Sequence, residues 1–277
     1  MARPVARERK GFSAAVFTLL TWAGTLLMFA PVAWMLLTSF KTENDAIAFP
    51  PKLFFEPTLE HYARAFSSGF VDFLVNSLVA TLVSTFVVIV LAVPAAYALS
   101  VRPVRKWRDV LFFLISTKMM PLAAGIVPLY LVARTVGLLN STTLLVIVYI
   151  SMNLPLAVWM IRSFMAEIPR DVFDAVRVDG AGKLRELLFI VMPLIRPGIA
   201  STALLCGIFA WNEFFLAVNL TTTNSTLPVF LQKFLSFGQL YNAQVAAVAI
   251  LVNIPVVAAG WLAQKSLTRG LTFGAVK

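Results

Sequence analysis

The sequence predicts an all-α polytopic membrane protein with six transmembrane helices and both termini in the cytoplasm. Of its 277 residues, 60% are hydrophobic and only 13% are charged, and the mean hydropathy of +0.86 exceeds that of an ordinary soluble globular protein. Several uncharged runs reach the ~20 residues that a helix needs to cross a bilayer. Lysine and arginine gather in alternate connecting segments, which is typical of cytoplasmic loops.

The first predicted span covers residues 12–40, follows a basic N-terminal tail and contains no charged residue. Because this run is longer than the apolar region of a signal peptide, we expect it to remain in the membrane. Pro121 and Pro128 are expected to break the third span. We predict a single transmembrane domain over residues 1–277, with the other five spans at about 73–101, 110–132, 143–161, 198–220 and 245–262.

The distribution of charge sets the predicted orientation. The side that carries both termini holds 17 of the 23 lysine and arginine residues and 7 of the 13 acidic residues, so the whole net charge of +10 lies there. The positive-inside rule makes that side cytoplasmic. A basic charge of this size is also found in nucleic-acid-binding proteins, but here its location accounts for it, and we predict no nucleic-acid partner.

The outer loop at residues 41–72 is polar and net acidic. It contains the only histidine, His61, which has no cysteine, further histidine or clustered acidic residue at ligand spacing. We therefore expect His61 to be a solvated loop residue and predict no metal site. The single cysteine, Cys206, excludes an internal disulfide.

The most informative stretch is the polar cytoplasmic loop at residues 162–197. A short helix is predicted over 171–177, a turn at Gly180-Ala181-Gly182 tolerates positive φ, and a second helix follows that is closed by prolines. Leucine and valine recur there at i, i+3, i+4 and i+7, at positions 184, 187, 188 and 191, which predicts one apolar stripe. The loop is predicted to form a helix-turn-helix elbow.

The elbow resembles the cytoplasmic loop of permeases in bacterial ATP-binding-cassette (ABC) importers. Their pattern is Glu-Ala-Ala, three residues, Gly, nine residues and Ile-x-Leu-Pro. Here the same spacing reads Asp174-Ala175-Val176, Gly180 and Ile190-Val191-Met192-Pro193, with Asp for Glu, Val for Ala and Met for Leu. Resemblance to the carbohydrate-uptake subfamily extends over nearly the whole chain and includes Trp211-Asn212-Glu213-Phe214, Thr226-Leu227-Pro228 and the C-terminal segment from Arg269.

This resemblance implies a type I ABC importer permease fold and a multi-pass subunit of the bacterial inner membrane. It implies import of a sugar or polyol, with a second homologous permease as heterodimer partner, two copies of an ABC ATPase and a periplasmic or extracellular solute-binding protein. It also implies that the elbow couples to the ATPase through Phe173, Asp174, Ala175, Asp179, Gly180 and Pro193. The alternative for the apolar face of the first elbow helix is that it packs back onto this chain.

No catalytic motif accompanies the elbow. A phosphate-binding loop needs Gly, four residues, Gly-Lys and then Ser or Thr, and the segment from Gly180 to Leu184 has neither the spacing nor the hydroxyl. We therefore expect no enzymatic activity and no cofactor in this chain, with ATP used by a partner subunit. The outer loop at residues 221–244 has Lys233 as its only charge, and we expect a partner to cover apolar residues such as Phe230, Leu235 and Phe237.

Polar residues within the predicted spans are candidates for the solute pathway. They are Lys118, Asn153, Asn212, Glu213 and Asn253. Ionisable residues in a bilayer are costly and often functional, but they also pair with each other, and asparagine also bonds helix to helix. One hypothesis is that Lys118 and Glu213 interact across the pathway. The alternative function is a secondary transporter driven by an ion gradient, which usually needs acidic relays and inverted repeats that are not evident here.

Overall fold

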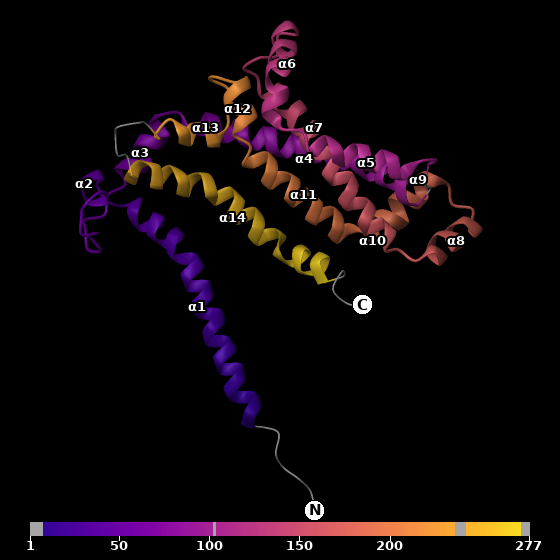
Figure 1. The fold of residues 1–277 in the computed structure, drawn as a ribbon, viewed down its shortest axis with the longest axis horizontal. Helices are drawn as coiled ribbons and strands as arrows, with labels where there is room; N and C mark the ends of the chain where they lie inside the picture. The colour runs from indigo at the N-terminus through magenta and orange to yellow at the C-terminus, as the bar shows by residue number, and fades with distance from the viewer. Residues whose placement is uncertain (1–7, 102–103, 236–241, 273–277) are drawn as a thin grey trace, which may run out of the picture. The chain divides into compact units, whose positions relative to one another are not determined.

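The computed structural model describes residues 8–101, 104–235 and 242–272, and the regular structure of these residues is helical throughout (Figure 1). The all-α fold class predicted from the sequence is confirmed. Two compact units are present, the first formed by the described parts of Met1–Ser68 and Phe234–Leu251, and the second by those of Gly69–Lys233 and Val252–Lys277. That the whole chain forms one transmembrane domain stays a prediction.

Long helices make up most of both units. They are α1 (Glu8–Thr38), α4 (Phe70–Ser100), α5 (Trp107–Lys118), α6 (Leu122–Thr135), α7 (Thr142–Ala166), α11 (Arg196–Trp211) and α14 (Asn242–Thr272). The short elements are α2 (Glu43–Ala46), α3 (Glu60–Ser67), α8 (Arg170–Val178), α9 (Lys183–Arg185), the π-helix η1 (Glu186–Val191), α10 (Met192–Leu194), α12 (Phe215–Leu220) and α13 (Leu227–Gln232).

Four segments are single helices long and apolar enough to cross a membrane: Ala14–Thr38, Phe70–Ser100, Thr142–Ala166 and Asn242–Leu262. They coincide with the first, second, fourth and sixth predicted spans. Two further pairs of helices pass the same criterion only when each bent pair counts as one span, which brings the total to six. The first span has none of its most apolar window buried within the described chain.

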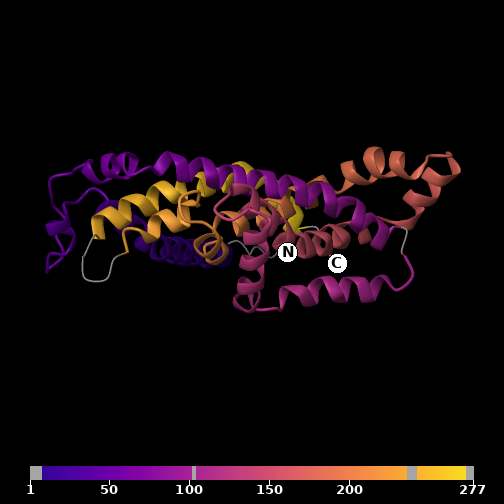
Figure 2. The ribbon, with the colours of Figure 1, turned by 90° about the horizontal axis from the view of Figure 1, so that it is seen from above.

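The third predicted span is not a straight helix. Helices α5 and α6 meet at 88° across a break at Met119–Pro121, and Figure 2 shows α6 turning away from the end of α5. Proline lacks an N–H group and disfavours helical geometry in the residue before it, so Pro121 ends α5 and stands at the N-cap of α6. The second predicted break is wrong, because Pro128 lies inside α6.

The fifth predicted span, 198–220, is also interrupted. Helix α11 ends at Trp211 and α12 begins at Phe215, so residues 212–214 form a non-helical break. At its other end α11 meets the segment Lys183–Leu194 at 79°, around Ile195. The continuous helix that the sequence predicted is therefore a shorter helix with a bend at each end.

The core of the second unit is built on α4 and α7, which lie side by side, with α11 packed against both (Figures 1 and 2). Small residues such as Ala92, Ala96 and Ala157 are fully buried and let the helices approach closely. Gly198, near the start of α11, lies directly against the ring of Phe164, and a Cβ atom there would overlap the ring. Close packing thus joins the elbow end of α7 to the start of α11.

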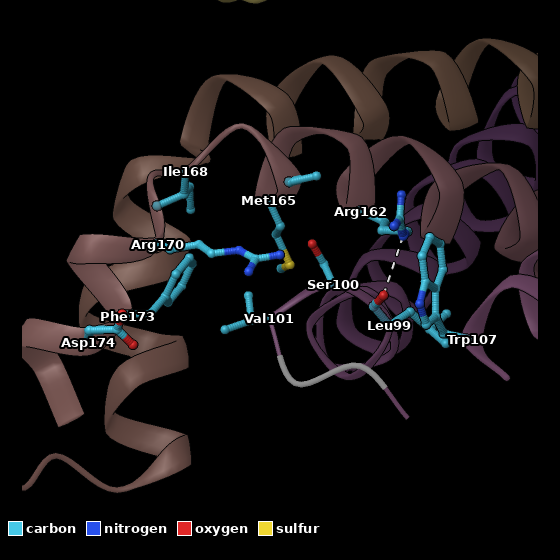
Figure 3. A pocket seen from close by; sticks show the side chains of 11 residues that line it. Leu99, Ser100, Val101, Trp107, Arg162, Met165, Ile168, Arg170, Phe173 and Asp174 are labelled. Carbon is cyan, nitrogen blue, oxygen red and sulfur yellow. Dashed lines mark hydrogen bonds between the residues drawn. The ribbon is translucent and has the colours of Figure 1, made fainter. Parts of the chain in front are cut away.

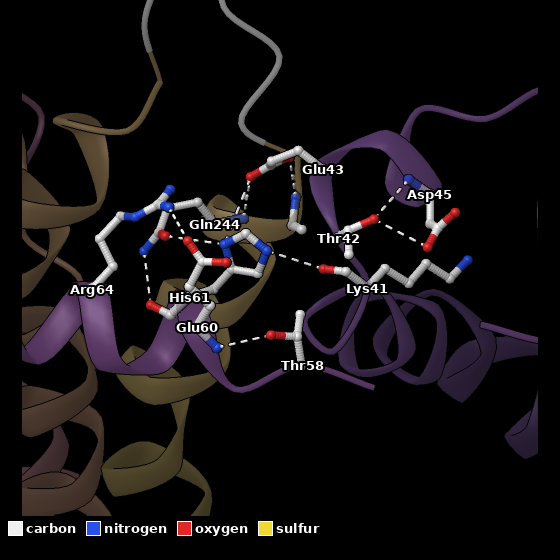
Figure 4. Close-up of polar contacts among 10 residues, drawn as sticks. Lys41, Thr42, Glu43, Asp45, Thr58, Glu60, His61, Arg64 and Gln244 are labelled. Carbon is white, nitrogen blue, oxygen red and sulfur yellow. Dashed lines mark hydrogen bonds and ion pairs between the residues drawn. The ribbon is translucent and has the colours of Figure 1, made fainter. Parts of the chain in front are cut away.

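In the first unit, a polar cluster joins α2 and α3 to the start of α14 (Figure 4). The Glu43 carboxylate accepts hydrogen bonds from the backbone N–H groups of Ala243 (3.0 Å) and Gln244 (2.9 Å). His61 is only 3% exposed, so the expectation that it is solvated is wrong. Its Nε2 lies 3.0 Å from the carbonyl oxygen of Lys41, and its Nδ1 lies 3.2 Å from Oε1 of Gln244.

The orientation of the Gln244 amide fixes how His61 is bound. Nε2 of Gln244 donates to the carbonyl oxygen of His61 at 3.0 Å, so Oε1 is the atom that faces the imidazole ring. Both ring nitrogens of His61 thus lie within hydrogen-bonding distance of an oxygen atom, and Oε1 of Glu43 lies 3.9 Å from Nδ1.

Candidate functional site

The elbow begins with α8, which ends in a turn that requires a left-handed residue. Gly180 has φ of +72°, and the N–H of Ala181 donates to the carbonyl oxygen of Val176 at 3.2 Å. A glycine in this conformation followed by a bond back across the turn is the Schellman pattern that closes helices. Gly182 has an ordinary φ of −70°, so Gly180 is the glycine on which the turn depends.

The two faces of α8 have different surroundings. Phe173 is 6% exposed and belongs to the buried cluster that includes Met165 of α7 and Val191 and Ile195 of the following segment. Asp174 and Ala175 are exposed. At Phe173 the apolar face therefore packs back onto this chain, which is the alternative that the sequence left open for that face.

The second half of the elbow is not the regular helix that the sequence predicted. It consists of α9, η1 and α10 in succession. Leu187 and Val191 are buried, whereas Leu184 is 69% and Leu188 is 44% exposed, so half of the predicted apolar stripe is wrong. A π-helix has a wider turn than an α-helix and changes which residues share a face. The segment still places buried side chains on the same cluster as Phe173.

The remaining elbow candidates lie in different settings. Asp179 and Gly180 are exposed, and Pro193 is partly buried within α10. Asp179 and Gly180 follow α8 directly and form the exposed turn after it, whereas Pro193 lies beyond η1. Pro193 therefore contributes to the connection with α11.

The ionisable residues of the spans do not pair with each other. Nζ of Lys118 donates to the carbonyl oxygen of Met152 at 2.8 Å. The carboxylate of Glu213 accepts the backbone N–H groups of Leu216 (2.9 Å) and Ala217 (3.1 Å). Within the described residues no ion pair joins Lys118 to Glu213, so the hypothesis of their pairing is wrong. Glu213 instead bonds the start of α12 across the break that follows α11.

The three asparagine candidates also have different surroundings. Asn153 is 1% exposed, and its Nδ2 donates to the carbonyl oxygen of Cys206 at 3.4 Å, which joins α7 to α11. Asn212 and Asn253 are exposed. Asn153 therefore bonds helix to helix, whereas Asn212 and Asn253 are accessible to solute or to another protein.

Comparison with known proteins decides the family. The family model described as the inner membrane component of binding-protein-dependent transport systems matches residues 65–269, which include the elbow and the break at Glu213. The chain belongs to this family. It is 36% identical over 252 residues to the probable ABC transporter permease protein y4oR of Sinorhizobium fredii, covering 89% of this chain and 90% of that protein.

Two further similarities support the assignment of this permease. It is 32% identical over 255 residues to the trehalose transport system permease protein SugB of Mycobacterium tuberculosis, covering 89% of this chain and 92% of that protein. A crystal structure of a bacterial ABC transporter that imports the acidic polysaccharide alginate contains a similar chain. Its TM-score is 0.75 at 24% identity, with 96% of this chain and all of that one covered. At this identity the likeness shows the fold.

The loop after α12 is held by a residue that the sequence patterns did not mark as a candidate. Oδ1 of Asn140 accepts the backbone N–H groups of Thr222, Thr223 and Asn224 at 2.9 to 3.1 Å. Asn140 has φ of +58°, a left-handed conformation that asparagine tolerates better than most residues. Its place in a short loop between spans was the available signal, but its partners lie more than 80 positions further along the chain.

The apolar residues of this loop are partly covered by the permease itself. Phe230 is fully buried, with its ring centroid 5.8 Å from that of Phe70 and 5.1 Å from that of Phe73. The expectation that a partner must cover Phe230 is therefore wrong. Leu235 is 59% exposed, and Phe237 lies outside the described residues.

Proposed function

We propose that this permease forms half of the translocation pathway of an ATP-driven importer for a sugar or polyol. The observation that carries the proposal is the α8 turn, which presents exposed residues at the motif spacing of ABC permeases within a family match that spans residues 65–269. No such elbow is needed by a transporter driven by an ion gradient. Family membership therefore favours the importer over that alternative.

Coupling to the ATPase is proposed to run through α8. Asp174, Ala175 and Asp179 are exposed and offer a contact surface, and Phe173 fixes the helix to the cluster that contains Met165 and Ile195. Since Met165 belongs to α7 and Ile195 directly precedes α11, a push on α8 would reach two membrane helices through packed side chains. Phe173 is then the residue that transmits the motion, and the exposed residues receive it.

The solute is proposed to be a carbohydrate because SugB is named for trehalose and the similar solved transporter imports alginate. Asn212 and Asn253 are the best candidates to meet solute, since both are exposed and amide groups bond sugar hydroxyls. Lys118 is exposed as well, at the break between α5 and α6. Asn153 and Glu213 are buried and support the helices around the pathway.

The proposed assembly contains a second homologous permease, two copies of an ABC ATPase and a solute-binding protein, in the bacterial inner membrane. The family description, which names binding-protein-dependent transport, supports the last of these partners. In this assembly ATP is used by the ATPase, and the permease itself needs no cofactor. Alternating access would follow from ATP-driven movement of the α8 helices.

Purification of the tagged permease from its native membrane tests this proposal. We expect an ABC ATPase and a second permease to co-purify, and we expect uptake by the purified assembly in liposomes to need ATP and a binding protein, with trehalose as the first probe. Solute uptake by the isolated permease in liposomes under a proton gradient, without ATP, would refute the importer and support the ion-driven alternative.

A further inference from the structure

A cavity of about 490 Å³ lies beside the first turns of α8 (Figure 3). Its other walls are the last turns of α4 and α7 and the start of α5. Its wall is mixed in character, and Val101, Met165 and Phe173 are among its apolar residues. Two guanidinium groups, those of Arg162 and Arg170, also line it, with the carboxylate of Asp174. A cavity lined by two cationic groups is not needed for the α8 contacts described above.

Arg162 is held in a fixed orientation. Its guanidinium carbon lies 4.1 Å from the centroid of the Trp107 ring, and its Nε donates to the carbonyl oxygen of Leu99 at 3.4 Å. Among the described residues this is the one hydrogen bond made by the Arg162 guanidinium, so its terminal N–H groups are available to a ligand. Stacking on an aromatic ring orients a guanidinium and favours bidentate binding of a phosphate or carboxylate.

Arg170 reaches the same cavity from α8. Figure 3 shows its guanidinium extending between Met165 and Val101, on the side of Ser100. Arg108, whose guanidinium carbon is 5.3 Å from the Trp107 centroid, also acts electrostatically on Arg162. Like charges close together repel each other, and an anion bound among them offsets that repulsion.

The position of the cavity indicates the source of that anion. Leu99 and Ser100 end the membrane helix α4, and Arg162 and Met165 lie in the last turns of the membrane helix α7. Tryptophan is enriched at the depth of lipid headgroups, and Trp107 is the first residue of α5. A basic pocket between membrane helices at this depth suits the phosphate of a phospholipid.

We propose that this cavity binds the phosphodiester headgroup of an anionic phospholipid, with the phosphate between Arg162 and Arg170. The apolar side chains of Val101, Met165 and Phe173 accept the glycerol and the first carbons of the acyl chains. A bound headgroup would hold Arg170, and with it the first turn of α8, at the membrane surface.

Lipid binding to the purified importer tests this site. The assembly is stripped of lipid in detergent, and binding of phosphatidylglycerol is measured by native mass spectrometry against phosphatidylcholine and against millimolar inorganic phosphate. We expect phosphatidylglycerol to bind preferentially, phosphate not to displace it, and Arg162→Gln and Arg170→Gln each to weaken binding about tenfold, since a charge-assisted hydrogen bond is lost.

Arg196→Gln is the matched control, because Arg196 is an exposed arginine of the same elbow region that does not line the cavity. Arg170 is exposed as well, so its variant is expected to fold. Equal binding by the wild type and Arg170→Gln, or equal losses in Arg170→Gln and Arg196→Gln, would overturn the site. Displacement of the lipid by inorganic phosphate would overturn the assignment of a lipid ligand.

Discussion

Gly180 is the residue on which the turn after α8 depends most directly. Its φ of +72° lies in the left-handed region, and a Cβ atom there would meet open space, so the cost of a side chain is conformational and not steric overlap. That cost is roughly 1–2 kcal/mol for an ordinary residue and more for a β-branched one. Gly182, two positions later, has φ of −70° and equally open surroundings, which makes it a natural control.

Gly180→Val should weaken ATPase association and reduce solute uptake, because the strained turn redirects the segment that leads to α11. Gly182→Val should leave both close to wild type. ATPase retained per permease through affinity purification, and initial uptake rate at matched expression, are the measurements. Equal behaviour of the two variants would contradict the role given to the left-handed turn.

Glu213 and Lys118 provide a second test at the scale of single residues. Since Glu213 accepts two backbone N–H groups, Glu213→Lys should leave both buried and unsatisfied, at a cost of about 1–3 kcal/mol each. The double variant Lys118→Glu with Glu213→Lys should therefore show no more uptake than the poorer single variant. Recovery of uptake in the double variant would restore the hypothesis that the two side chains pair.

At the scale of elements, breaks in the helices position the polar groups. Pro121 separates α5 from α6 close to Lys118, and the break at 212–214 exposes Asn212 while burying Glu213. Where a membrane helix is broken, backbone groups lose their internal partners and must be bonded by side chains. The carboxylate of Glu213 accepts backbone N–H groups at the start of α12, and Oδ1 of Asn140 accepts those of the loop after α12.

Asn140 allows backbone conformation and hydrogen bonding to be separated. Asn140→Ala removes the Oδ1 acceptor and the Nδ2 donor to Thr223 Oγ1, and it also strains the left-handed φ. Asn140→Gly removes the same acceptor and donor without that strain, and Asn140→Asp keeps an oxygen in place. We expect uptake to be highest in the aspartate variant, lower in the glycine variant and lowest in the alanine variant. The free energy of unfolding of the glycine variant should be lower than that of the wild type by roughly 1–3 kcal/mol. Wild-type stability and uptake in the glycine variant would show that the three bonds do not hold the loop.

For the whole molecule, hydropathy and motif spacing predicted the four spans that are single helices, the elbow and the family. Proline chemistry predicted the break at Pro121, but the bend around Ile195 and the break at 212–214 were not predicted, because the length of an apolar run reports how much chain can lie in lipid but not its direction. The π-helix escaped prediction since it changes the face of Leu188 without changing the composition. His61 was misjudged because its partner Gln244 lies 183 positions away, so no local pattern marks its burial.

We propose that α8 contacts the ATPase directly. Since the only native cysteine, Cys206, is buried, Ala175→Cys can carry a photoreactive maleimide at an exposed position of α8, with exposed Thr223→Cys in the outer loop as control. After irradiation of the purified importer, we predict a covalent adduct between the ATPase and the Ala175→Cys variant and none with the Thr223→Cys variant. Absence of the adduct at position 175, or equal yields at both positions, would contradict the coupling role of α8.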